Sequence, residues 1–218
     1  MTDQTLKQQI EGLTIDSRRP LIISDADEVL LQFALTFETF LAEQGCTVQF
    51  DSFKLLGNVR DSASGQPVAP DRLGLLLNRF FSQHVGDCPP VAGAVDALAR
   101  LSDHAQVIIL SNVPASAAAL RRRSMARHGL DYPLISNTGP KGPAVQAIRK
   151  AHRARAVFLD DIPMNLTSVA AHDAAVHRIQ FIADERLRPL LPACPDAHAR
   201  IDVWPEAEAH ILAYLTGP

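Results

Sequence analysis

Two carboxylates one residue apart, Asp25 and Asp27, form a pair that could do chemistry. They follow the apolar run Leu21-Ile22-Ile23, which is too short for a helix and is typical of a strand buried on both faces of a parallel sheet. Side chains at the carboxyl end of such a strand point into the crevice where open α/β sheets bind ligands. Because two acids there repel each other and lose solvation, we expect a divalent cation to hold them. An Asx-type turn that merely ends the strand is the alternative.

Other apolar runs also end in, or lead to, polar residues that could act in a reaction. In chain order these are Ser111 with Asn112, then Lys141 at the head of a helix, then Asp160 with Asp161. Each has an ordinary explanation, because Ser111 or Asn112 could cap a helix, Lys141 could be a loop lysine, and the acid pair could form a turn. Their order and spacing together favour one shared site.

Alternating strands and helices predict an α/β fold, a three-layer Rossmann-like core built on a parallel sheet. The strands expected after the first lie at 107–110, 133–135, 156–159 and 177–182, with an edge strand at 201–204. The expected helices lie at 91–101, 115–128, 144–151, 164–171 and 207–214. We expect the core to comprise residues 1–31 and 89–218.

Residues 32–88 lack this alternation and predict a small, all-helical cap inserted after the first strand. Phe33, Phe37, Phe40 and Leu41 fall on one helical face. We interpret this stripe as helix packing, with a substrate-facing wall as the alternative. A polar loop at 57–67 precedes a second helix, which begins near Pro70 and ends before residue 86.

Composition narrows the possible classes of protein. The 218 residues fit one domain, or one domain with an inserted lobe, and 47% are hydrophobic. A net charge of −3 without a basic tail gives no reason to expect nucleic acid as a partner. No apolar run reaches eighteen residues and the first nine are polar, so we expect neither a membrane span nor a signal peptide. The sequence leaves the oligomeric state open.

Two further sets of residues have plain interpretations. Cys46, Cys88 and Cys194 are odd in number and far apart, which suits free thiols in a reducing cytoplasm. The run 121–123 is three arginines, which we expect at a solvated helix end, where cations favour the helix dipole. A phosphate-binding patch is the alternative for these arginines.

The ordered motifs resemble those of the haloacid dehalogenase (HAD) superfamily of hydrolases and phosphatases, over essentially the whole chain. Its signatures hhhDxDx(V/T), hhh(T/S)N and hhhDDxxxN match residues 22–29, 108–112 and 157–165, and its isolated lysine matches Lys141. Each signature alone is weak, and the ordered set is specific. The inserted segment 32–88 lies where the family places its helical cap. Two departures are Glu28, where the family usually has glycine, and Gly142, because the family lysine is commonly followed directly by proline.

The resemblance implies a Mg²⁺-dependent phosphatase that hydrolyses a small phosphomonoester through an aspartyl-phosphate intermediate. Asp25 would be the nucleophile, and Asp27 would be the general acid and then the general base. The implied metal ligands are Asp25, Asp27, Asp160 and Asp161. The implied substrate contacts in the core are Ser111, Asn112 and Lys141. In the cap we suggest Arg60, together with Asn58 and Arg79, as contacts for a second polar group of the substrate. Asn165 would orient the loop that carries the two adjacent aspartates.

Three alternatives differ from this hypothesis in identifiable ways. A haloacid dehalogenase needs neither a second acid nor a metal, so Asp27 and the pair Asp160-Asp161 argue against it. A response-regulator receiver has its acid pair first and its lysine last, the reverse of the order here. A catalytically silent member would bind a ligand or partner through the cap, and Glu28 is the best support for that interpretation.

Overall fold

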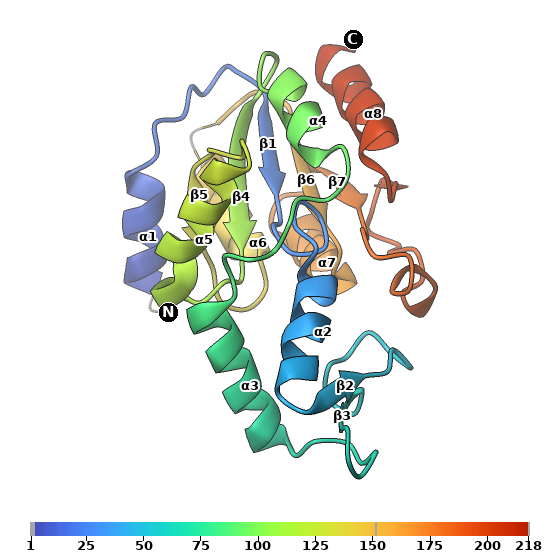
Figure 1. Cartoon of the computed structure of the whole chain (residues 1–218). Helices are drawn as coiled ribbons and strands as arrows, with labels where there is room; N and C mark the ends of the chain where they lie inside the picture. The colour runs from blue at the N-terminus through green and yellow to red at the C-terminus, as the bar shows by residue number, and fades with distance from the viewer. Residues whose placement is uncertain (1–2, 151, 218) are drawn as a thin grey trace.

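A computed structural model describes residues 3–150 and 152–217, and its centre is a sheet of six parallel strands (Figure 1). The strand order is β5-β4-β1-β6-β7-β8. The strands are β1 (Leu21–Ser24), β4 (Gln106–Ser111), β5 (Leu134–Ser136), β6 (Ala156–Asp160), β7 (His177–Gln180) and β8 (Ala199–Arg200). Because β1 lies between β4 and β6, the residues that follow it emerge at the middle of the sheet edge.

Alternating side chains of the strands divide the interior into two apolar layers. Ile22 and Ile109 pack on the side of α4 (Ala94–Leu101), α5 (Ala115–Arg127) and α8 (Trp204–Thr216). Leu21 and Ile23 pack on the side of α1 (Asp3–Glu11), α6 (Gly142–Arg149) and α7 (Pro163–His172). The expected three-layer, Rossmann-like core is therefore confirmed. Every described helix is too short or too polar to cross a lipid bilayer.

The inserted segment contains a hairpin as well as helices, so the expectation of an all-helical cap was wrong in this respect. Helices α2 (Phe33–Glu43) and α3 (Pro70–Gln83) flank the antiparallel strands β2 (Cys46–Val48) and β3 (Val59–Asp61). Each strand buries one end residue, Cys46 on β2 and Val59 on β3, while Thr47 next to Cys46 is exposed, and this alternation is too short to detect in the sequence. In Figure 1 the cap lies beyond the carboxyl ends of the strands.

Two hydrogen-bonded segments carry the chain between core and cap. The Val91 amide donates to the Leu30 carbonyl (2.8 Å), and the Gln32 amide donates to the Pro89 carbonyl (2.9 Å). The boundaries that we proposed from the sequence, between 31 and 32 and between 88 and 89, fall in this paired region. We keep that division as a proposal.

The edge strand and the last helix differ from the sequence expectation. The edge strand is Ala199–Arg200 rather than 201–204, and Trp204 instead begins α8. Pro205 favours a helix start there because its fixed φ suits the first turn. The buried Trp204 indole donates to the Val29 carbonyl (2.9 Å), which anchors that start beside the turn after β1. Residue 151, where we expected α6 to end, lies outside the described residues.

Candidate active site

The strand register brings Asp25, Asp160 and Lys141 together. Ser24 lies opposite Ile109 of β4 and Leu159 of β6, so the next residues of β1 and β6, Asp25 and Asp160, are neighbours. The Lys141 ammonium nitrogen lies 2.6 Å from Asp25 Oδ2 and 2.7 Å from Asp160 Oδ2. One buried cation thus bridges two acids from adjacent strands.

Gly142 explains how Lys141 reaches these acids. A Cβ at Gly142 would lie only 2.2 Å from the Ser168 carbonyl oxygen of α7, so only glycine lets the start of α6 approach α7 this closely. The Gly142 amide also donates to the Ser168 hydroxyl oxygen (3.1 Å). The departure from a direct lysine–proline pair therefore has a packing reason.

Three acids converge at the end of β1 and β6. Asp25, Asp160 and Asp161 are all buried, and each offers a carboxylate oxygen within 4.8 Å of the others. The Asp160 carboxylate has the most hydrogen-bond partners of the three. Its Oδ1 accepts from the Ile162 amide and from Asn165 Nδ2 (both 2.9 Å), and its Oδ2 accepts from Lys141 Nζ. The contact from Asn165 fits its predicted orienting role.

Burial strongly affects the protonation of this cluster. It raises the pKa of Asp25 to about 7; Lys141 opposes this rise, and Asp160 and Asp27 add to it. Burial also raises the pKa of Asp161 well above its usual range, with Asp160 and Asp25 adding to the effect. Burial by itself lowers the pKa of Lys141, but Asp160 and Asp25 more than offset it and the net shift is upward. The site therefore holds more carboxylates than its lysine can neutralise, which favours a bound cation.

Asp27 has a partner that sequence reasoning missed. Its Oδ1 accepts a hydrogen bond from Nη2 of Arg121 (2.6 Å). Arg121 belongs to α5, and its side chain is fully buried. The expectation of a solvated arginine was wrong for Arg121, whereas Arg122 and Arg123 are exposed. Arg121 stands on the same helical face as Ala117 and Met125, and its place in this apolar stripe is the signal that could have revealed its burial. The Asp27 carboxylate turns toward Arg121 and is not one of the three that converge.

Ser111 and Asn112 lie at the end of β4, beside the acids of β1. The buried Ser111 hydroxyl oxygen accepts from the Val113 amide (3.2 Å). Asn112 lies at the cavity surface, where its Nδ2 donates to the Gly139 carbonyl (3.1 Å) and its Oδ1 accepts from Asn137 (2.8 Å). The loop before Lys141 is thereby tied to the end of β4.

Glu28 fixes the start of the cap to the core. It adopts a left-handed φ of 57°, the conformation that favours the glycine usual at this position in the family. Its buried carboxylate accepts from the amides of Ala34 (2.7 Å) and Asp184 (3.1 Å), so it caps α2 in place of an N-cap side chain. Burial raises its pKa to about 7, although both amides oppose this rise. Glu28 therefore ties the turn after β1 to α2, and it also lines the cavity.

The three cap residues suggested as substrate contacts lie elsewhere. Arg60 Nη1 donates to the Gly65 carbonyl (3.1 Å), and Arg79 Nη1 donates to Gln44 Oε1 (2.7 Å). The buried Asn58 donates to the Ser52 carbonyl (2.5 Å). None of the three is among the described residues that line the cavity, so their placement does not support the predicted role of Arg60.

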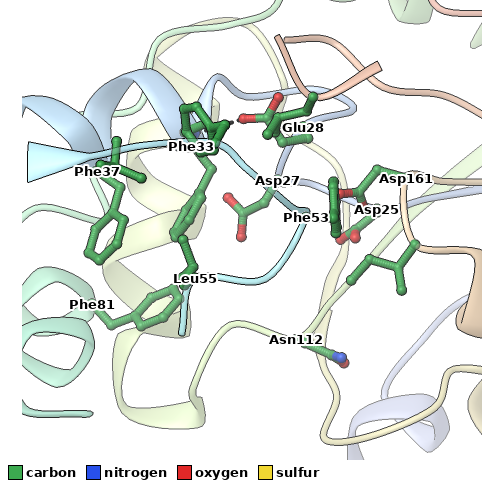
Figure 2. Close-up of a pocket in the computed structure, with 15 residues that line it drawn as sticks. Asp25, Asp27, Glu28, Phe33, Phe37, Phe53, Leu55, Phe81, Asn112 and Asp161 are labelled. Carbon is green, nitrogen blue, oxygen red and sulfur yellow. Dashed lines mark hydrogen bonds between the residues drawn. The ribbon is translucent and has the colours of Figure 1, made fainter. Parts of the chain in front are cut away.

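A cavity of about 300 Å³ lies between the strand ends and the cap. In Figure 2, Asp25 and Asp161 lie at one end and Phe33, Phe37 and Phe81 lie toward the other. Phe33 and Phe37 also pack within the core, so the aromatic stripe serves both as helix packing and as a cavity wall.

Comparison with known proteins identifies the fold. No protein-family model matches the chain, and no curated protein matches it. Solved structures do match. The HAD family hydrolase from Deinococcus radiodurans R1, with bound phosphate and sodium, is 18% identical with a TM-score of 0.60, over 93% of this chain and 100% of that chain.

Two further solved structures agree. The HAD-hydrolase YfnB from Bacillus subtilis, bound to magnesium, is 14% identical with a TM-score of 0.60, over 89% of this chain and 99% of that chain. CbbY from Rhodobacter sphaeroides, in complex with phosphate, is 16% identical with a TM-score of 0.57, over 85% and 95% of the two chains. The chain therefore has the fold of the HAD-type hydrolases, as its ordered motifs predicted.

Proposed function

We propose that this protein is a HAD-type phosphatase that uses Mg²⁺ to hydrolyse a small phosphomonoester through an aspartyl-phosphate intermediate. The observation that carries the proposal is the convergence of Asp25, Asp160 and Asp161 around Lys141, at one end of a cavity that Asp25, Asp27 and Asp161 line. The phosphate or magnesium bound in the similar structures from Deinococcus, Bacillus and Rhodobacter supports this choice. We further propose that the protein acts in the cytoplasm and needs no nucleic-acid or membrane partner.

The donor set fits Mg²⁺. Carboxylate oxygens are the protein ligands that this ion prefers, and it takes few of them alongside water and phosphate oxygens. Asp25 and Asp161 line the cavity, whereas Asp160 is fully buried and is not among the described residues that line it. We therefore propose Asp25 and Asp161 as the direct carboxylate ligands, with Asp160 holding Lys141 in place. When bound, the ion would damp the repulsion between the Asp25 carboxylate and the anionic phosphoryl group.

The side chains supply the remaining chemistry. A carboxylate oxygen of Asp25 attacks phosphorus, a new O–P bond forms, and the bond from phosphorus to the alkoxide breaks. Asp27 gives its proton to the departing alkoxide, which leaves as an alcohol. Asp27 then takes a proton from water as that water attacks phosphorus, the O–P bond to Asp25 breaks, and inorganic phosphate is released. Lys141 neutralises charge on Asp25 and on the phosphoryl group during both steps.

Arg121 has a positioning role in this proposal. Its ion pair keeps Asp27 at the cavity, where 24% of the Asp27 side chain is exposed. Asp27 must carry a proton before it can act as the acid, and Arg121 must then release the Asp27 carboxyl group or share it with the substrate. The ion pair with Arg121 therefore fixes the position of the Asp27 side chain between turnovers.

Two alternatives from the sequence remain distinguishable. Dehalogenation would use Asp25 without Mg²⁺, and the apolar part of the cavity would also accept the alkyl chain of a haloalkanoic acid. A silent binding protein would show no turnover at all, yet Asp25, Ser111, Lys141, Asp160 and Asp161 are all present and buried beside one another.

A panel of phosphorylated metabolites and aryl phosphates, assayed with Mg²⁺ and with excess EDTA, tests the proposal. We expect phosphate release only with Mg²⁺, and none from Asp25→Asn, because an amide is a poor nucleophile. Asp131→Asn, an exposed aspartate after α5, is the matched control and should keep wild-type turnover. Full activity in EDTA, or activity that survives in Asp25→Asn, would overturn the proposal.

Asp27→Asn tests the acid–base role separately. A general acid contributes about 10²–10⁴-fold, so alkyl phosphates with basic leaving groups should lose that factor. An aryl phosphate should keep most of its first step because a phenol leaves with little help. Phosphate should then accumulate on Asp25, detected as a phenol burst and as added mass on the quenched protein. Equal losses on both substrates without a burst would remove Asp27 from this role.

A further inference from the structure

The cavity beside Asp25 is divided into a charged end and an apolar end. The charged end consists of Asp25, Asp27, Glu28 and Asp161, with Asn112 beside them. Most of the remaining lining side chains are apolar and include five of the nine phenylalanines of the chain, namely Phe33, Phe37, Phe50, Phe53 and Phe81. No lysine, arginine or histidine occurs among the described residues that line it.

The apolar end is held in place by its own packing. Phe33 stacks on Phe37 (5.4 Å between ring centroids) and on Phe81 (6.0 Å). Phe80, which is fully buried behind them, makes edge contacts with Phe33 (5.3 Å) and Phe37 (5.1 Å). These rings come from α2 and α3, so the wall exists before any ligand enters, which lowers the ordering cost of binding.

The segment between β2 and β3 closes the wall from the hairpin side. Phe53 and Leu55 lie in this segment and line the cavity (Figure 2). The Arg186 guanidinium lies 4.9 Å from the Phe50 ring centroid, while the same guanidinium is paired with Glu38 (2.7 Å) and Asp184 (2.7 Å). The positive charge of Arg186 is therefore already paired with Glu38 and Asp184, so we do not expect it to bind a ligand.

We infer that the substrate is a phosphomonoester whose organic part is uncharged and apolar, an alkyl chain or an aromatic ring. This inference rests on the proposed phosphatase function. With the phosphoryl group at Asp25, the organic part must extend into the cavity, where it meets phenylalanine and leucine side chains. A second anionic group on the organic part would lose water against these apolar side chains, with no lysine, arginine or histidine among the described lining residues to pair with it, and a sugar would lose water from its hydroxyls without gaining partners. A volume of about 300 Å³ is at the small end of ligand pockets, which suits one ring or a short chain.

Chain-length dependence provides the test. The n-alkyl phosphates from ethyl to octyl have nearly the same leaving-group chemistry, so their kcat/KM values compare burial alone. We expect kcat/KM to rise by about two- to fourfold per methylene until the cavity is full. Hexyl phosphate should exceed a hexose phosphate by at least about tenfold. A flat series, or a preference for the hexose phosphate, would overturn the inference while leaving Mg²⁺-dependent turnover intact.

Neighbouring leucines give a matched pair of variants. Leu55 lines the cavity, whereas Leu56 points to solvent with 54% of its surface exposed. Leu55→Lys should lower the ratio of kcat/KM for hexyl over ethyl phosphate at least about tenfold, mainly through KM, whereas Leu56→Lys should keep the ratio. This ratio is independent of the folded fraction because both substrates are measured on one preparation. An unchanged ratio in Leu55→Lys would contradict the inference. If no phosphomonoester is hydrolysed with Mg²⁺, the proposed function itself fails and the inference fails with it.

Discussion

Replacing Lys141 by Met removes the cation that bridges Asp25 and Asp160 while nearly preserving side-chain length. Each of the two pairs has a separation of 2.6 or 2.7 Å, which gives about 6 kcal/mol of gross Coulomb attraction at an effective dielectric constant of about 20. Desolvation of the buried ammonium group offsets much of this attraction. Breaking a buried pair by removing one partner typically costs about 3–5 kcal/mol, so we expect Lys141→Met to lose that much at pH 8 without Mg²⁺.

The loss should depend on pH in a defined direction. The folded-state pKa of Asp25 is already raised to about 7 from a usual value of 3.8, so its favourable contribution is complete below pH 4 and is lost as the pH rises through 7. Without Lys141 the folded-state pKa of Asp25 rises further, because the group that opposed the rise is gone. The folded variant therefore takes up protons more readily than the wild type, and the two stabilities should converge as the pH falls from 8 to 5.

Urea unfolding at pH 5 and pH 8, with and without Mg²⁺, measures these differences. Mg²⁺ should stabilise Lys141→Met at least as much as the wild type, because three carboxylates then lack an internal cation, yet the variant should not turn over. Lys150→Met changes an exposed lysine at the other end of α6 and should match the wild type at both pH values. If Lys141→Met lost equal stability at pH 5 and pH 8, the loss would come from packing and the charge argument would be refuted.

Three further predictions concern the surroundings of the site. Arg121→Met should lower alkyl-phosphate turnover about 10–100-fold by misplacing Asp27. It should change the free energy of unfolding in urea by less than about 2 kcal/mol, because the buried Nε and Nη1 of Arg121 have no hydrogen-bond partner to lose. Parallel losses of turnover and of unfolding free energy would count against a positioning role. Glu28→Gln should flatten the fall in stability between pH 5 and pH 8, because the raised pKa of about 7 makes Glu28 cost stability as the pH rises through that range, and urea midpoints at the two pH values check this. Gly142→Ala should cost about 1–3 kcal/mol by thermal or urea unfolding because its Cβ would meet the Ser168 carbonyl, whereas Gly74→Ala, which has open space within its helix, should be neutral or stabilising.

Local patterns in the sequence were sufficient to predict the core of the fold and the converging residues. The apolar runs before Asp25, Ser111 and Asp160 are buried parallel strands, because only a strand covered on both faces needs uninterrupted apolar residues. Strand ends in a parallel sheet share one edge, so polar residues at those ends had to meet. Lys141 joined them from the head of a helix, which is also where the sequence predicted it.

Contacts between distant segments decided the rest. Arg121 and Asp27 are 94 residues apart, so although the helical stripe could have shown that Arg121 is buried, nothing in the sequence shows that Asp27 is its partner. The hairpin of the cap depends on Val59 pairing with Val48 across ten intervening residues, and Val59 lies within the segment 57–67 that the sequence predicted to be a polar loop. The apolar cavity arises because α2, α3 and the segment after β2 each present an aromatic side chain to the same space. A sequence determines which side chains must be buried, but packing in three dimensions decides which of them face each other and which face a ligand.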